Sequence, residues 1–159
     1  MEEAKKEPEV AEEVIEEIVV AQSDNKMIFS ETIGELATAL SKAQGEMKGV
    51  EKSKQGYGYK FADLGAVLDT LREPFAKNGL AIVQGHELKK GKNPSVVTYS
   101  RIIHSSGEWT ESALEIPIAQ MKGLSPAQMI GVVCTYAKRY LIQAQAGLAS
   151  EDTDGTVKK

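Results

Sequence analysis

The hydrophobic and polar positions change their period along the chain, and these changes predict its elements. Apolar residues recur at helical spacing from Ser30 to about Gly49, and again from Leu64 to Phe75. Ser30 is a candidate cap for the first helix, and Asn78-Gly79 is a typical end for the second. Two helices are therefore expected before residue 80.

The period then becomes that of β-strands. Strands are predicted at Leu80–Leu88, Ser95–His104 and Glu108–Ile118, with short turns rich in glycine, serine, asparagine and lysine between them. Strands joined by such short turns have to pair antiparallel, because parallel strands need long crossovers. A three-stranded antiparallel meander follows from this pattern.

A long helix is predicted after Ser125, with Pro126 in its first turn. Its apolar stripe is expected to pack on the sheet and consists of Ile130, Val133, Cys134, Ala137, Leu141, Ala144 and Leu148. The opposite side carries Thr135, Arg139 and Gln143, with Val132, Tyr136 and Tyr140 beside them. Valine and tyrosines on a helix back suggest that a second subunit or a ligand covers it. The fold class is α+β, with helices before and after the meander.

The charge divides the chain into three parts. Residues 1–26 hold nine acids and three lysines, residues 27–150 hold fourteen bases and eleven acids, and residues 151–159 carry a net charge of -1. This pattern predicts an acidic N-terminal arm with a candidate short helix at 10–21, a core domain at 27–150 and a short flexible tail at 151–159. The overall charge of -4 thus hides a mildly basic body.

Composition excludes several classes of protein. A single cysteine and two histidines leave little for a disulfide framework or a transition-metal site, and neither a metal nor a cofactor is expected. No apolar run approaches the ~18 residues that span a bilayer. The acidic start does not resemble an export signal, so a cytoplasmic protein without membrane contact is expected.

The sequence offers no evident catalytic arrangement. The glycine-bearing run at 56–61 lacks the third glycine of a dinucleotide loop, and Gly85–Asn93 has the wrong spacing and context for a phosphate-binding P-loop. Cys134 lies on the core-facing stripe, where a thiol is usually inert packing. The two histidines lie in or at the end of strands with no evident nucleophile, so a non-enzymatic binding protein is expected.

Basic and aromatic residues form a more organised pattern. The candidate DNA-binding residues are Lys52, Lys54, Tyr57, Tyr59 and Lys60 in the segment between the first helices, Lys89, Lys90 and Lys92 at the hairpin tip, and Lys138 and Arg139 on the last helix. Lysines neutralise phosphates, and aromatic rings stack on unpaired bases. The same residues are also compatible with a solvated face and a few core aromatics.

Four blocks of sequence resemble the Erf (essential recombination function) family of phage single-strand annealing proteins. They are Tyr59–Leu64 (YKFADL), Gly79-Leu80, His104–Trp109 (HSSGEW) and Gly131–Ser150 (GVVCTYAKRYLIQAQAGLAS). Their order and spacing together are specific, and the resemblance covers about residues 30–155.

The resemblance implies a recombination protein that works without ATP. Such proteins coat single-stranded DNA as homo-oligomeric rings or filaments and promote pairing of complementary strands. A basic pair on the helix after the sheet lines the DNA groove in the wider group, and Lys138 and Arg139 match it. A phage exonuclease or a host single-strand-binding protein are the implied partners, although the short tail departs from longer relatives.

Two further hypotheses stay open on the sequence. One is a single-strand DNA-binding protein that protects DNA without pairing it, and the other is a structural or assembly protein that binds no DNA. If copies assemble, Val132, Tyr136 and Tyr140 are the candidate contacts between them.

Overall fold

The computed structural model describes residues 27–48, 54–55, 60–61, 63–120 and 122–149. The elements in chain order are β1 (Met27–Phe29), α2 (Gly34–Glu46), β2 (Lys54–Gln55), β3 (Lys60–Phe61), α3 (Leu64–Lys77), β4 (Leu80–Lys89), β5 (Ser95–His104), β6 (Trp109–Pro117) and α4 (Pro126–Ala146). The candidate helix at 10–21, the side chains of Lys52, Tyr57 and Tyr59, and the acidic tail lie outside the described residues.

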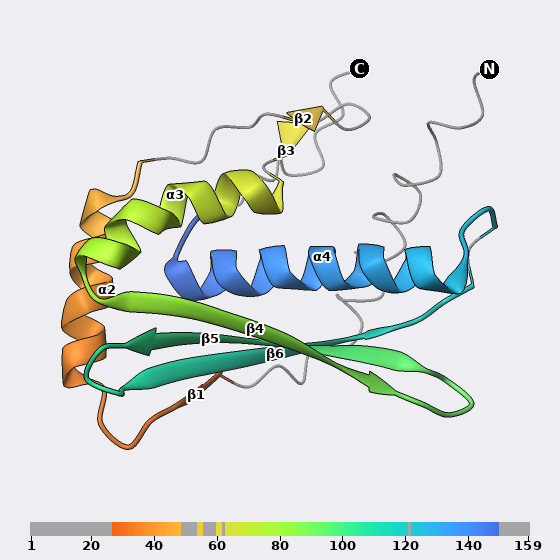
Figure 1. Cartoon of the computed structure of the whole chain (residues 1–159), viewed down its shortest axis with the longest axis horizontal. Coiled ribbons are helices and arrows are strands. Elements are labelled where there is room, and N and C mark those ends of the chain that lie inside the picture. Colours follow the sequence, from red (N-terminus) through yellow and green to blue (C-terminus); the bar gives the residue numbers. More distant parts are fainter. Residues whose placement is uncertain (1–26, 49–53, 56–59, 62, 121, 150–159) are drawn as a thin grey trace.

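The predicted α+β class is confirmed, with one strand more than expected. The main sheet is antiparallel in the order β1-β6-β5-β4, and β2 pairs with β3 in a separate two-stranded sheet. The meander from β4 to β6 is the predicted one, whereas β1 adds to its β6 edge through Met27↔Ser112, Ile28↔Glu111 and Phe29↔Thr110. The long helix α4 runs along the sheet, and α2 and α3 lie toward one end of it (Figure 1).

The helices pack on the even-numbered side chains of the strands. Ile102 of β5 joins Leu36, Leu71 and Ile142 in one buried cluster between the sheet and all three main helices. A second cluster places Val96, Leu114 and Ile116 of the sheet against Val133 and Ala137 of α4. Alternation therefore sends the even-numbered residues of β4, β5 and β6 to the helices and their odd-numbered residues to the other face. We call these the helix face and the open face. In β1 the numbering is reversed, because Met27 and Phe29 pair with Ser112 and Thr110.

Both ends of α4 are capped by local chemistry. Ser125 accepts a hydrogen bond from the Gln128 amide, and the Gln128 side chain accepts one from the Ser125 amide, which forms a reciprocal capping box. Gly147 ends the helix with φ of 69°, and a Cβ there would approach Gln44 Nε2 to 2.9 Å. The left-handed backbone favours glycine at this position, whereas the Gln44 amide is the end of a flexible side chain that can shift.

The predicted cap at Ser30 is wrong. α2 begins at Gly34, with Ile33 in the capping position and no side-chain cap from its own segment. Ser30 instead accepts from the Trp109 amide at 2.9 Å and so fastens β1 to β6. The α2 N-terminus is capped from a distance, because the Leu36 amide donates to Glu108 Oε2 at 2.7 Å.

This contact makes stability depend on the ionisation of Glu108. The Leu36 amide lowers the pKa of the Glu108 carboxyl more than burial raises it. The stabilisation is therefore present above the carboxyl's ordinary pKa and is lost as the pH falls through the lowered value. We expect Glu108→Gln to lower the melting temperature at pH 7, and the gap to wild type to close toward pH 3. Thermal scans by circular dichroism at both pH values measure this, and an equal gap at both would contradict it.

Candidate nucleic-acid interface

The packing of α4 on strand β4 brings the polar side chains of Gln84 and His86 close to Lys138. Gln84 on the helix face of β4 donates to the Lys138 carbonyl at 3.0 Å and to Ser100 Oγ at 3.0 Å. Two residues further along the same face, His86 Nδ1 lies 2.9 Å from Thr98 Oγ1. The Lys138 side chain remains partly exposed. Gln84 thus ties α4 to the strand at the point where Lys138 meets His86.

The pKa of His86 is affected by its closeness to Lys138. Burial lowers the pKa of His86, and the Lys138 ammonium lowers it further. The Cys134 thiol also faces this region, and burial raises its pKa. Because the lowered pKa favours the neutral form of His86 at pH 7, Lys138 is the positively charged group in this region.

The proximity of Lys138 gives a direct expectation for the titration of His86. Removing the ammonium in Lys138→Ala should raise the His86 pKa, because protonation no longer opposes a neighbouring positive charge. An NMR titration of the ring protons measures this, with the His86 signals assigned from a His86→Gln sample. Lys122→Ala is the matched control and should leave the His86 titration unchanged. An unchanged His86 titration in Lys138→Ala would contradict the contact.

The far end of β4 adds further positive charge. Lys90 and Lys92 are exposed in the turn between β4 and β5, and Lys122 is exposed in the segment that leads to α4. The Ile118 amide donates to the Pro94 carbonyl at 2.8 Å, so the start of this segment lies beside the end of the turn. We call Lys138, Lys90, Lys92 and Lys122 the basic track. His86 and Lys90 are about 13 Å apart along the strand, at ~3.3 Å per residue.

The ion pairs within the described part of the chain leave this track uncompensated. They involve Arg72, Lys77, Lys89 and Arg101, and none involves a member of the track. Lys89, a predicted DNA contact, is bound to Glu115 at 2.8 Å. A phosphate could compete for Lys89 only by displacing that carboxylate, whereas the four track lysines are available.

Arg139 lies in a different environment from its neighbour. Its residue is only 8% exposed, and its guanidinium lies 5.5 Å from the Tyr136 ring and 5.4 Å from the Tyr140 ring. The two rings stack at 4.3 Å. Lys138 and Arg139 therefore do not form one surface pair in this structure, and Arg139 is positioned to hold the tyrosines.

The predicted contacts on the back of α4 are also largely buried. Tyr136 is 3% exposed and belongs to the cluster of Val133 and Ala137, while Val132 and Tyr140 keep partial exposure. Of the polar residues expected there, Gln143 is buried and Thr135 is exposed. A second subunit is thus not needed to explain the apolar residues on this side.

Two of the lysines predicted in the segment before α3 belong to the small two-stranded sheet. Lys54 and Lys60 belong to β2 and β3, where the pairs are Lys54↔Phe61 and Gln55↔Lys60. Their backbone pairing is described, and the neighbouring Lys52, Tyr57 and Tyr59 lie outside the described residues. These five residues stay predictions from the sequence.

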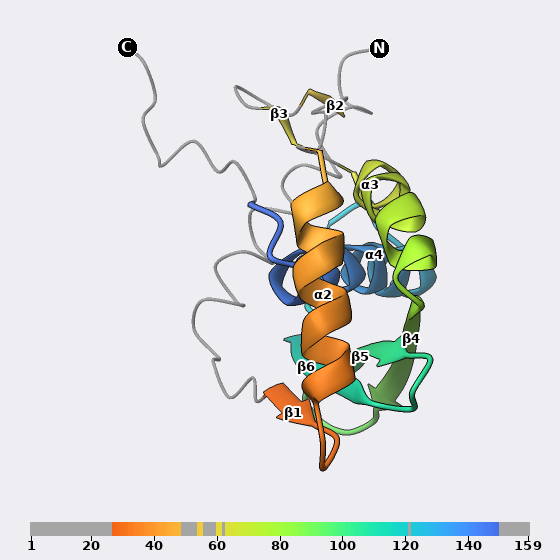
Figure 2. The ribbon, with the colours of Figure 1, turned by 90° about the vertical axis from the view of Figure 1, so that its left-hand side faces the viewer.

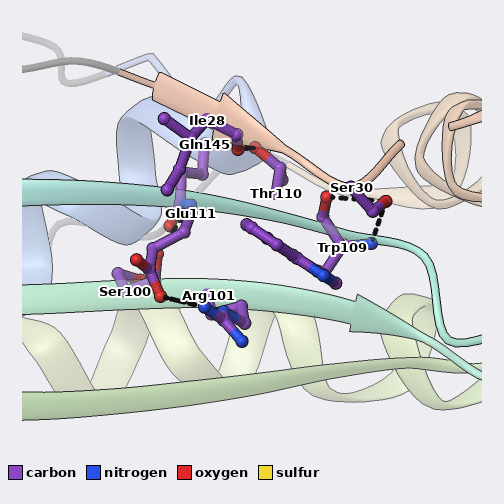
Figure 3. A network of polar contacts seen from close by, with 8 residues as sticks. All are labelled: Ile28, Ser30, Ser100, Arg101, Trp109, Thr110, Glu111 and Gln145. Carbon is purple, nitrogen blue, oxygen red and sulfur yellow. Dashed lines mark hydrogen bonds and ion pairs between the residues drawn. The ribbon is translucent and has the colours of Figure 1, made fainter. Parts of the chain in front are cut away.

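The open face of the sheet has the opposite electrostatic character. Arg101 Nε donates to Glu111 Oε2 at 2.8 Å, its Nη2 lies 2.8 Å from the same oxygen, and its guanidinium stacks 4.1 Å over Trp109 (Figure 3). Glu87 accepts from Tyr99, and Glu115 binds Lys89. Three carboxylates against two paired cations disfavour a polyanion on this face.

The described residues show neither of two common catalytic arrangements, a P-loop or a metal cluster. The segment Gly85–Asn93 forms the end of β4 and its turn to β5, so it does not precede a helix as a P-loop does. Among the described residues, no three His, Cys, Asp or Glu side chains are placed to hold a metal ion. No helix in the described part of the chain is long and apolar enough to cross a bilayer.

These features describe an α+β protein with a track of uncompensated lysines beside one sheet edge. A model of the ERF superfamily matches residues 36–159, and the chain belongs to this family. No curated protein and no solved structure matches the chain. Family membership confirms the resemblance found in the sequence and indicates a function of the phage recombination type, with DNA as partner.

The sequence did not indicate that Gln84, His86 and Lys122 belong to the site. His86 and Gln84 are single polar residues in a strand, and only the register of β4 against β5 places them beside α4. Lys122 lies in a loop far from the hairpin in sequence. The alternation of β4 could have indicated that Gln84 and His86 share a face, although not which face it is.

Proposed function

We propose that the protein binds single-stranded DNA and anneals complementary strands without ATP, as an oligomer whose basic tracks hold the phosphates. Membership in the ERF superfamily carries this proposal, because it indicates recombination and DNA interaction over most of the chain. The DNA contacts that we propose are Lys138, Lys90 and Lys92, and Arg139 would act mainly by holding Tyr136 and Tyr140.

The charge of the track supports contact with the backbone rather than with base edges. Lysine ammonium groups are point charges that neutralise phosphates and carry little sequence information. Annealing requires binding through the phosphate backbone, since the bases must stay free to pair with a second strand. Binding should therefore be indifferent to sequence and should weaken steeply with salt.

A track of four lysines is short for tight binding by one copy. Several copies arrayed along one strand add such contacts, because each later contact forms at a high effective concentration. Oligomerisation thus belongs to the proposed mechanism. Partners such as an exonuclease or a host single-strand-binding protein remain part of the proposal only through the family resemblance.

The experiment is annealing of two complementary oligonucleotides labelled with a donor and an acceptor dye, without ATP. Wild-type protein is expected to accelerate pairing at least tenfold over the spontaneous rate at the same strand concentrations. Binding without acceleration would favour a protein that only protects single strands. A lack of binding at low salt would favour a structural role and contradict the proposal.

A further inference from the structure

Among the residues that the structure describes, the exposed large apolar side chains lie at the two opposite edges of the main sheet. At the β1 edge, Met27, Ile28 and Phe29 are 47–49% exposed, and Ile33 follows just past the strand at 42%. At the β4 edge, Val83 is 55% exposed and Leu88 is 48% exposed. The strand order places β6 and β5 between the two groups, so they cannot meet within one chain (Figure 2).

Neither the β1 edge nor the β4 edge has the features that usually prevent an edge strand from pairing with another chain. Natural edge strands are commonly protected by proline, lysine or bulges. β4 is ten residues long and has no proline, and its lysine, Lys89, is bound to Glu115 at the very end. β1 has no charged residue and no proline. Both edges are thus open to a further strand among the described residues.

The topology makes the two edges complementary to each other. β1 is antiparallel to β6, β6 to β5, and β5 to β4, so β1 and β4 run in opposite directions. A second copy in the same orientation, placed beside the first, therefore presents its β1 antiparallel to the first copy's β4. Every copy then keeps its helices on the same face of one continuous sheet.

We propose that the β4 edge of one copy binds the β1 edge of a second copy, head to tail. Main-chain hydrogen bonds would join the strands, and Val83 would pack against Ile28, because both side chains lie on the open face of the sheet. Because the two contact surfaces differ, the contact repeats and generates a ring or a filament. The right-handed twist between strands gives the array its curvature.

This inference rests on the proposed function for its purpose, since it supplies the array that a short basic track needs. Lys138 lies on the helix face in each copy, so the tracks of successive copies lie on one side of the joined sheet. It also moves the subunit contact away from Tyr136, which is buried within the chain.

Two edge variants test the contact. Val83→Lys places a charge on the β4 edge, and Phe29→Lys places one on the β1 edge. Both positions are about half exposed, so folding should be retained, which circular dichroism and Trp109 fluorescence check. Ala37→Lys on the exposed side of α2 is the matched control. Molar mass is measured by size-exclusion chromatography with light scattering, without DNA.

The mixture of the two variants is decisive. Wild type and Ala37→Lys should form species larger than a dimer, and each edge variant alone should be monomeric. A 1:1 mixture should double in mass, because each variant retains the edge that the other lacks, and growth stops at a dimer. A mixture that stays monomeric would overturn the inference. So would dimers of Phe29→Lys alone, which would indicate symmetric pairing of β4 with β4.

The wild-type protein separates this inference from the proposed function. A wild type that stays monomeric up to about 100 μM yet anneals DNA would overturn the edge contact and leave the proposed function standing. Residues 1–26 of the same chain would then be the expected occupant of the β1 edge. Assembly through the edges without any binding of single-stranded DNA would support the edge contact and contradict the proposed function.

Discussion

Replacing Lys138, Lys90 and Lys92 together by alanine is expected to weaken binding of a single-stranded oligonucleotide by about 100-fold at low salt. Each lysine is partly or fully exposed and has no carboxylate partner among the described residues. An exposed charge pair contributes up to about 1 kcal/mol, and three such losses correspond to about two orders of magnitude. Fluorescence anisotropy of a labelled oligonucleotide measures the affinity.

The salt dependence distinguishes direct contact from a general loss of charge. Three lost phosphate contacts should reduce the slope of log affinity against log salt by about 2, at ~0.7 per contact on single strands. The matched control is Lys42→Ala/Arg72→Ala/Lys77→Ala, which removes the same charge from α2 and α3. If the control lost as much affinity and slope as the track variant, the placement of the DNA on the track would be wrong.

Replacing Ile102 by alanine is expected to lower the free energy of unfolding by about 3–4 kcal/mol. Its side chain is fully buried where β5 meets α2, α3 and α4, and truncation at such a site leaves a cavity. Urea unfolding followed by the fluorescence of Trp109, the single tryptophan, measures the loss. Lys42→Ala is the control at an exposed position of α2 and should cost less than about 0.5 kcal/mol. A small cost at Ile102 would mean that the sheet and helices do not share one core.

Long periodic elements could be predicted from the sequence, whereas the short strands β1, β2 and β3 could not. The end of α3 at Asn78-Gly79 and the three meander strands follow from local pattern and turn chemistry. β1 has three residues, too few to show a period of two, and its partner β6 is about 80 residues away. The same long-range pairing explains why Ser30 bonds to Trp109 rather than to α2.

The candidate site was predictable in its residue types but not in its geometry. A helical projection places Arg139 opposite the apolar stripe, on a side expected to be covered by a second subunit or a ligand, whereas the structure buries it beside two tyrosines of its own chain. The projection assumes that one side of α4 is covered, whereas α4 contacts both the sheet and α3. Lys138 kept its predicted place at the surface, and its neighbours His86 and Gln84 became visible only through the pairing of β4 with β5.

The most direct measurement is the annealing rate of two complementary dye-labelled strands with wild type and with Lys138→Ala/Lys90→Ala/Lys92→Ala, without ATP. Wild type is expected to accelerate pairing, and the variant should lose that acceleration while keeping its melting temperature. Restoring the charge with arginine at the three positions should restore most of the rate. Equal acceleration by wild type and the alanine variant would contradict a DNA track on this side of the sheet, and no acceleration by wild type would contradict annealing itself.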